Sequence, residues 1–364
     1  MPYTPPPSAE LADIDTPALL LDYGKLTANI DAMAAFVAST HGKLRPHAKT
    51  HKCIEIARLQ LTSGATGITC AKVSEAEALA DGGIPDILIA NQIVGPIKVA
   101  RLVELARRCA VTVAVDDAGN VRELSSAAES AGVQIACYVE VNIMDRCGVE
   151  PGKPTAELAR LVADSGGLRL AGVQAYEGHL QNVVPFEERR ARTEKDMLRA
   201  LEAKRSIEAV GLPVEEVSGG GTGTHAITGR LPWMTELQAG SYATMDAKYA
   251  AVGGADFENA LTVLATVVSR PRPDKAVIDA GLKALTPEHG DPVALIEGAS
   301  WLDFSEEHGE LALAGPAREL AVGDKIELIP SHGCTTINLY DRFHVVEDGH
   351  LKDVWRIAAR GCSQ

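Results

Sequence analysis

The sequence predicts an α/β protein, a (βα)8 TIM-type barrel joined to a C-terminal all-β domain. Eight short, apolar, β-branched runs alternate with amphipathic stretches up to about residue 250, and most of them start 19 to 25 residues apart. Strands that alternate with helices form parallel βαβ units, and eight units at this spacing favour a barrel over the alternative, an open doubly wound sheet. Beyond residue 250, strand-like runs are joined by turn residues with little helical periodicity, which predicts the second domain.

The eight runs predict the barrel strands in order. They are KLRPHAK from residue 43, GITCAKV from 67, DILIANQ from 86, VTVAVDD from 111, QIACYVEVN from 134, LRLAGVQAYEG from 168, VEEVSGGG from 214 and ELQAGSYA from 236. The stretches between them, such as PIKVARLVELARRC, repeat apolar residues every three or four positions, as amphipathic helices do. The two longer gaps, before the sixth and seventh runs, are expected to hold longer helices.

The predicted domain boundaries follow from these runs. The early run TPALLLD precedes the barrel strands and is expected to add a strand to the β-domain. We therefore predict an N-terminal arm and strand over residues 1–22, the barrel over residues 23–250 and the β-domain over residues 251–364. The proline-rich start, MPYTPPPSAE, is expected to form an extended arm.

The composition excludes several classes of function. A formal net charge of −14 argues against binding to nucleic acid or to acidic membrane surfaces. No run approaches the roughly 18 apolar residues of a membrane span, and the start of the chain has neither the basic nor the apolar region of a signal peptide. Seven scattered cysteines without CxxC spacing argue against a disulfide framework or structural zinc, so we expect a reducing cytoplasm.

Polar and reactive residues recur where the predicted strands end. They are Lys49, Lys72, Asn91, Gln92, Asp116, Asp117, Asn142 with Arg146, Tyr176, Glu177, His179, Gly219 to Gly221, Ser241 and Tyr242. Barrel enzymes carry their chemistry at the carboxyl ends of the strands. The sequence therefore predicts an active site at that end of the barrel.

The segment RPHAKTHK, residues 45–52, ends the first predicted strand with three cations and two imidazoles. A lysine held among other cations at a barrel mouth can lose its proton near neutral pH and act as a Schiff-base nucleophile. Lys49 is the better candidate, because Lys52 would already open the following helix. Its partner is expected to be a carbonyl substrate or pyridoxal phosphate.

A glycine-rich segment, SGGGTGT, lies between the seventh and eighth strands. Its backbone N–H groups and the Thr222 hydroxyl can bind a phosphate, at the place where barrel phosphate sites recur. It is not a dinucleotide fingerprint, because it lacks the acidic residue of a βαβ unit. Together with the lysine, it predicts pyridoxal phosphate.

The chain resembles the D-threonine aldolase and D-serine dehydratase family, which are fold-type III enzymes related to alanine racemase. The segments that carry the resemblance run nearly end to end: DTPALLLDYGKLTANI, RPHAKTHK, AKVSEAE, NQIVGP, DRCGV, GVQAYEGH, SGGGTGT, TELQAGSYATMD, IDAGLKAL and PSHGCTTINLYD. The pattern is nearest to the D-threonine aldolases. The resemblance implies a pyridoxal phosphate barrel with a β-domain, usually a homodimer.

The resemblance also implies roles for particular residues. Lys49 matches the lysine that forms the aldimine with the cofactor, Arg146 an arginine near its phenolic oxygen, and Tyr176 a tyrosine in contact with it. The phosphate-side loops are matched by Gly220, Thr222, Gly223, Gly240, Ser241 and Tyr242.

The family also carries a divalent metal on a His-x-Asp or His-x-Cys pair, which here is His332 and Cys334. Aspartate is commoner in the aldolases and cysteine in the dehydratases. A thiolate favours zinc, whereas a carboxylate favours manganese or magnesium.

The chain departs from the family at the metal pair, where it has a cysteine, and also at the residue expected to act as the base. Family aldolases tend to have histidines after the QAY tyrosine, where this chain has Glu177 and Asn182. His179 lies between them and is the nearest imidazole, with a structural role as the alternative.

These residues support two reactions of a D-3-hydroxy amino acid, whose D-configuration comes from the resemblance alone. Breaking the Cα–Cβ bond gives glycine and an aldehyde, whereas breaking the Cα–H bond with loss of hydroxide gives a keto acid and ammonia. The surrounding segments favour the aldolase over the dehydratase of D-serine or 3-hydroxyaspartate. A racemase, which would need a tyrosine base such as Tyr340, and a non-catalytic pyridoxal phosphate-binding protein are weaker alternatives.

Overall fold

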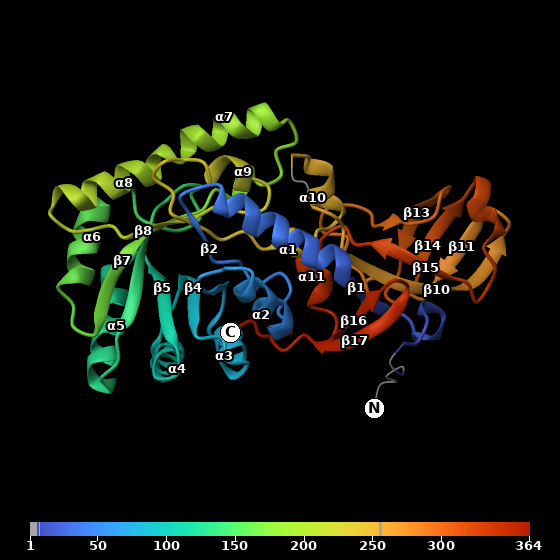
Figure 1. Ribbon diagram of the computed structural model, residues 1–364, viewed down its shortest axis with the longest axis horizontal. Coiled ribbons are helices and arrows are strands. Elements are labelled where there is room, and N and C mark those ends of the chain that lie inside the picture. The colour runs from blue at the N-terminus through green and yellow to red at the C-terminus, as the bar shows by residue number, and fades with distance from the viewer. Residues whose placement is uncertain (1–5, 7, 255–256) are drawn as a thin grey trace.

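Eight parallel strands form the barrel in the computed structural model, which describes residues 6, 8–254 and 257–364 (Figure 1). The strands are β2 (Lys43–Leu44), β3 (Ile68–Cys70), β4 (Asp86–Gln92), β5 (Ala110–Val115), β6 (Ile135–Glu140), β7 (Leu168–Ala175), β8 (Glu216–Gly219) and β9 (Glu236–Leu237). Their order is β2-β9-β8-β7-β6-β5-β4-β3. A parallel bridge between His47 and Thr69 joins the two ends of this order, so the sheet closes on itself. The predicted barrel is confirmed.

Helices cover the outside of the barrel. They are α2 (Ile54–Thr62), α3 (Val73–Asp81), α4 (Pro96–Ala106), α5 (Ala118–Ala131), α6 (Lys153–Ala163), α7 (Phe186–Asp196), α8 (Leu198–Ala209) and α9 (His225–Thr228). The apolar faces of α2, α3, α4, α5, α6 and α8 pack on the buried strand residues in one continuous core. Local signals set their ends. In α5, for example, the Asp117 carboxylate accepts from the Asn120 amide, and Gly132 ends the helix with φ of 65°.

The expectation of longer helices in the two long gaps is wrong. The gap before β7 contains α6, which has only 11 residues, and the additional length lies in residues 141–152. The gap before β8 is divided between α7 and α8, with Met197 between them. A gap length alone does not determine how many helices fill it.

A second, mostly antiparallel sheet of nine strands forms the β-domain. Its strands are β1 (Ala18–Asp22), β10 (Leu261–Arg272), β11 (Lys275–Ile278), β12 (Val293–Ala294), β13 (Ala299–Phe304), β14 (Gly309–Leu313), β15 (Lys325–Ile329), β16 (Arg342–Glu347) and β17 (His350–Arg356). As predicted, the N-terminal strand joins this sheet, because β1 pairs with β10 on one side and β16 on the other. The short helix α11 (Gly333–Ile337) interrupts the strands, so this domain is not entirely β.

Two helices and the end of the chain connect the barrel to the β-domain. Helix α1 (Tyr23–Ala38) runs across both in Figure 1, and α10 (Ala247–Val252) follows the last barrel strand. After the last strand of the β-domain, the chain returns to the barrel. There the Gln364 carbonyl accepts hydrogen bonds from the Ser74 amide and the Ser74 hydroxyl. The domain boundaries at residues 22 and 250 stay predictions, and the proposed proline-rich arm falls partly on residues 1–5 and 7, outside the described residues.

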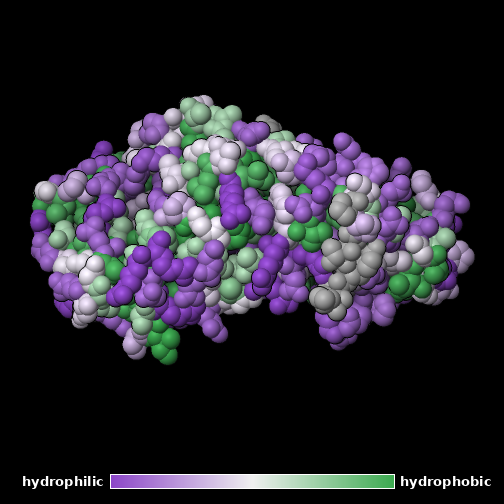
Figure 2. Space-filling view, turned by 60° about the horizontal axis from the view of Figure 1, so that its bottom comes forward, coloured by the Kyte–Doolittle hydropathy of each residue, from purple (hydrophilic) through white to green (hydrophobic). Residues whose placement is uncertain are grey.

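None of the helices in the described part of the chain is both long and apolar enough to cross a bilayer. The face in Figure 2 is mostly hydrophilic, and its apolar patches are scattered.

Candidate active site

A cavity of about 520 Å³ lies where the carboxyl ends of the barrel strands meet the β-domain. Nine of the residues predicted for the site line it: Lys49, Arg146, Tyr176, Gly220, Thr222, Gly240, Ser241, His332 and Cys334. Strand ends bring the first seven together, and the β-domain contributes the last two. Of the residues predicted to act as catalyst, cofactor contact or metal ligand, three do not line the cavity: His179, Gly223 and Tyr242.

Pairing distinguishes the lysines and arginine of RPHAKTHK from one another. The Arg45 guanidinium is bound by Glu236 and Asp86, with N–O distances of 2.8 and 2.7 Å. The Lys52 ammonium lies 2.6 Å from the Glu75 carboxylate. Among the described residues, no carboxylate or other hydrogen-bond acceptor is bound to the Lys49 ammonium. Lys49 is therefore the cation of this segment that is available to a ligand.

The two histidines of the segment are buried and neutral. Burial, reinforced by the charge of Lys49, lowers the pKa of His47 well below its usual value. The His47 Nδ1 atom accepts from the Lys49 amide at 3.3 Å, so this ring supports the backbone of the lysine. Burial also lowers the pKa of His51 to about 4. Neither ring is a cation that could compete with Lys49.

Tyr176 lies between two cations. Its ring centroid is 5.7 Å from the Lys49 Nζ atom and 5.7 Å from the Arg146 Cζ atom. Burial, with the nearby charge of Glu177, raises the pKa of the Tyr176 hydroxyl. The ring therefore presents a neutral phenol and an aromatic face to the cavity.

The glycine loop after β8 is closely packed and has free amides. Gly220 has φ of 75°, and a Cβ on Gly221 would lie 2.5 Å from the Gln181 Oε1 atom. Within the described chain, the amides of Thr222 and Ser241 have no acceptor, although both residues line the cavity. Close backbone with unpaired N–H groups is what a bound phosphate requires.

Glu177 and Gln181 hold this loop in place through hydrogen bonds. The buried Glu177 carboxylate accepts from the Gly220 amide at 3.3 Å, from the Thr224 hydroxyl at 2.6 Å and from the Thr228 hydroxyl. The Gln181 Oε1 atom accepts from the Gly223 amide at 2.9 Å. Gly223 therefore belongs to the support of the loop rather than to the cavity wall.

The His332–Cys334 pair is held by a buried carboxylate. The His332 Nδ1 atom lies 3.1 Å from the Asp246 Oδ2 atom, which also accepts from the Gly333 amide. Burial lowers the pKa of His332, but the bonds to Asp246 and Cys334 outweigh it and raise the pKa to about 10. Burial raises the pKa of Cys334, but His332 and Lys49 outweigh it and lower the pKa. A carboxylate behind an imidazole, beside a thiol inclined to ionise, is the donor set of a metal site.

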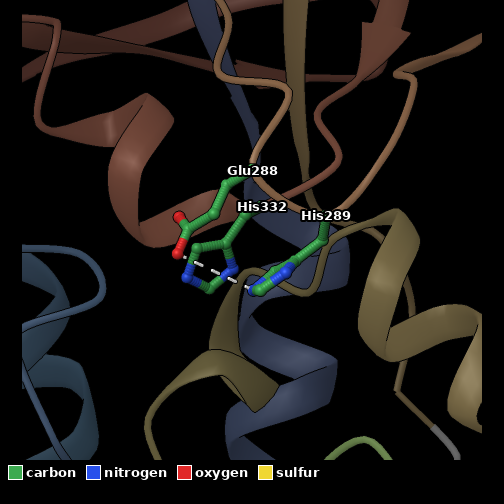
Figure 3. Close-up of side chains that lie close together, drawn as sticks. All are labelled: Glu288, His289 and His332. Atoms are coloured by element: carbon green, nitrogen blue, oxygen red, sulfur yellow. Dashed lines mark ion pairs between the residues drawn. The ribbon is translucent and has the colours of Figure 1, made fainter.

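Glu288 and His289 extend this group of donors (Figure 3). The ligand atoms of Glu288, His289 and His332 lie within 4.8 Å of one another, and the two imidazole rings contact each other edge to face. His289 also lines the cavity. Both side chains come from the loop before β12.

His179 and Tyr242 lie away from the cavity. The His179 Nε2 atom is 2.9 Å from the Asp196 Oδ2 atom at the end of α7. Residues 178–180 form a 3-10 helix after β7, which turns this side chain outwards. Tyr242 is fully buried; its hydroxyl accepts from Gln60, while its amide donates to the Thr222 hydroxyl at 2.9 Å. Tyr242 thus positions a residue of the cavity wall without reaching the cavity itself.

Other residues of the site were not identified from the sequence. Lys248, Tyr249 and His289 line the cavity, and they lie in a loop or in the short helix α10, where no strand periodicity marks an end. Asp246, behind His332, stands in the quoted segment TELQAGSYATMD. Asp246 caps α10 by accepting from the Tyr249 amide at 2.8 Å, and an aspartate just before a helix is a sequence signal of such a cap.

Comparison with known proteins defines the class and then the family. Residues 21–248 match the family described as "Alanine racemase, N-terminal domain", and residues 260–346 match the "Putative serine dehydratase domain". The chain is thus an alanine racemase-like barrel protein with a serine dehydratase-type β-domain.

Relatives of known name are similar over nearly the whole chain. A D-threonine aldolase of Arthrobacter sp is 42% identical, over 99% of this chain and 97% of its own length. A 3-hydroxy-D-aspartate aldolase of Paracoccus denitrificans (strain Pd 1222) is 38% identical, over 98% and 94%. The chain belongs to the D-threonine aldolase and D-serine dehydratase family of lyases.

Solved structures agree with this assignment. The crystal structure of D-threonine aldolase from Filomicrobium marinum has a TM-score of 0.97 at 42% identity, covering 99% of this chain and 100% of that one. A cysteine-to-alanine variant of a D-threo-3-hydroxyaspartate dehydratase, in the metal-free form, has a TM-score of 0.87 at 27% identity, covering 96% and 98%.

Proposed function

We propose that this protein is a pyridoxal phosphate- and divalent metal-dependent aldolase that cleaves a D-3-hydroxy amino acid to glycine and an aldehyde. One arrangement carries the proposal. An unpaired lysine, a glycine loop with free amides and a His–Cys pair backed by a carboxylate face a single cavity. The names of the aldolase relatives support the same reaction.

The cavity residues fit the cofactor. Lys49 would hold its aldehyde carbon through the side-chain amine, and the amides of Thr222 and Ser241 would bind its phosphate. Arg146 would donate to its phenolic oxygen, and Tyr176 would contact the ring. When bound, pyridoxal phosphate supplies an electron sink for the bond that breaks at Cα.

His332 and Cys334 would hold the metal, with Asp246 orienting the imidazole. A divalent cation there would supply a Lewis acid that lowers the proton affinity of the substrate's β-hydroxyl. The metal-free variant of the related dehydratase supports metal binding in this family. The proposal gives His179 no catalytic role, because its ring is bound to Asp196 outside the cavity.

The dehydratase reaction is the second candidate, and Cys334 favours it. In that reaction Lys49 would take the proton from Cα, and the cation would assist the loss of hydroxide. The match of residues 260–346 to a serine dehydratase domain supports this alternative. A racemase is less well supported. Its nominated base, Tyr340, does not line the cavity, and the Tyr340 hydroxyl donates to the Ala284 carbonyl at 2.9 Å.

Product identification tests the proposal. The purified protein would be incubated with pyridoxal phosphate and a divalent metal, and D-threonine, D-serine and the 3-hydroxyaspartates would each be followed by NMR. Glycine with an aldehyde is the expected result, and Lys49→Ala should abolish it. Keto acid and ammonia would instead establish the dehydratase.

The assembly and location are part of the same proposal. We expect a homodimer in the cytoplasm that acts on a small molecule and binds neither nucleic acid nor membrane. The net charge of −14 supports the last point. Sedimentation of the purified protein measures the assembly.

A further inference from the structure

Lys248 lines the cavity from the first turn of α10. Its backbone fixes its position beside the predicted metal pair, because the Lys248 amide donates to the Ser331 carbonyl at 3.3 Å. Asp246, the N-cap residue of this helix two positions earlier, binds His332. Lys248 therefore enters the cavity from the side of the His332–Cys334 pair.

The cavity is basic although the protein as a whole is acidic. Its lining contains Lys49, Arg146 and Lys248, and none of the lining residues in the described chain is an Asp or Glu. The whole chain carries a formal charge of −14. Cations gathered in a cavity without counter-charges favour anionic ligands.

The proposed function accounts for two of these three cations. Lys49 would be occupied by the cofactor aldehyde, and Arg146 would face the phenolic oxygen. The Lys248 ammonium has neither an ion pair nor a hydrogen-bond acceptor among residues 6, 8–254 and 257–364. It is the cation left for the substrate.

We propose that Lys248 is a specificity-determining residue that binds an anionic group on the β-carbon of the substrate. The inference rests on the proposed function, in which the β-hydroxyl meets the His332–Cys334 side of the cavity. A second substituent on the same carbon lies within that side, next to Lys248. The preferred substrates are then 3-hydroxy amino acids with a β-carboxylate, as in 3-hydroxyaspartate, ahead of those with a β-methyl group, as in threonine.

The competing role for Lys248 is to bind the α-carboxylate, which every amino acid substrate carries. The two roles differ in what a Lys248→Met variant loses. Loss of a β-carboxylate partner affects only substrates that have this group, whereas loss of an α-carboxylate partner affects all substrates equally.

The test compares charged and neutral ligands of the same shape. Values of kcat/KM are measured for D-3-hydroxyaspartate, D-3-hydroxyasparagine and D-threonine with the holoenzyme and with Lys248→Met and Lys248→Arg. Lys153→Met, which removes an exposed lysine at the start of α6, is the control for the change in net charge. Dissociation constants for D-aspartate, D-asparagine and D-alanine, which lack the β-hydroxyl, are measured from the absorption spectrum of the bound cofactor.

We expect Lys248→Met to lower kcat/KM for hydroxyaspartate by about 10- to 100-fold, because the variant removes one charged contact with this substrate. Hydroxyasparagine and threonine should change less than about twofold, and Lys248→Arg should retain the preference. An equal loss for all three substrates, or no loss, overturns the inference.

The binding measurements keep this outcome separate from that of the proposed function. If D-aspartate binds the wild-type protein no more tightly than D-asparagine, the inference fails whichever reaction is found. If D-aspartate binds more tightly and Lys248→Met removes the difference, the inference stands even where no cleavage occurs.

Discussion

Lys49 differs from its basic neighbours in having no acidic partner. Arg45 and Lys52 are bound by carboxylates of the strands and helices around them, so their charges are neutralised within the fold. Lys49 instead faces the aromatic ring of Tyr176 and the cavity. The same short segment therefore supplies both structural ion pairs and the candidate nucleophile.

In the proposed metal site, Cys334 should determine which divalent metal is preferred. Replacing Cys334 with Asp exchanges a thiolate for a carboxylate, and carboxylates favour manganese or magnesium over zinc. We expect Cys334→Asp to weaken zinc binding by at least about tenfold relative to manganese. Competition with a metal chelator on the protein measures both affinities, and an unchanged ratio would show that Cys334 is not a ligand. Cys362→Ser, which removes a half-exposed cysteine elsewhere in the chain, is the control and should leave both metal affinities unchanged.

His51 should make stability depend on pH. Its folded-state pKa of about 4 lies below the usual 6.5, because burial disfavours the cation. As the pH falls, the unfolded chain therefore binds this proton before the folded chain does. The unfolding free energy that His51 contributes above pH 6.5 is lost as the pH falls towards 4. Between pH 7 and pH 5 this amounts to about 2 kcal/mol of unfolding free energy. Urea unfolding of His51→Asn should show a smaller loss over this range, and a slope equal to that of the wild type would contradict the assignment.

The residues between β7 and α7 hold the glycine loop that would bind the phosphate of the proposed cofactor. Glu177 binds the Gly220 amide, and its replacement with Gln would turn an N–H donor towards that amide. We expect Glu177→Gln to weaken pyridoxal phosphate binding by about 5- to 100-fold, the cost of one unsatisfied buried group. Affinity for pyridoxal, which lacks the phosphate, should stay the same. Titration of the apoprotein with both compounds measures this difference.

The exposed Glu187, in the first turn of α7, provides a matched control as Glu187→Gln. If both ligands lose affinity equally in Glu177→Gln, the residue acts on the whole site rather than on the loop.

The barrel half of the site was more predictable from the sequence than the β-domain half. Lys49, Tyr176 and the glycine loop follow strands whose apolar runs are visible, so their convergence at one end of the barrel could be anticipated. His289 and Lys248 follow no periodic element, and only the tertiary structure brings them to the cavity. His179 stood in a suitable segment, but the turn after β7 directs its side chain to Asp196.

At the scale of the whole molecule, the N-terminal strand makes the β-domain discontinuous in sequence. The side chain of Leu19, in β1, is fully buried in a core shared with the β-domain strands and α1. Truncation to Leu19→Ala should cost about 2–5 kcal/mol of unfolding free energy, because it leaves a cavity in this core. Urea unfolding followed by tryptophan fluorescence measures the loss. The exposed Leu302, changed to Ala, should cost far less.

The position of β1 also has a consequence for synthesis on the ribosome. This apolar strand leaves the ribosome before the barrel strands, but its partners β10 and β16 begin at residues 261 and 342. Synthesis adds roughly 5–20 residues per second, so β1 has no partner strand for on the order of 10 to 50 s before β10 is made. The barrel, whose strands all lie before residue 238, can assemble during that interval. A nascent chain held at about this length would thus present the Leu19–Leu21 segment to chaperones, so this strand is made before the barrel and pairs after it.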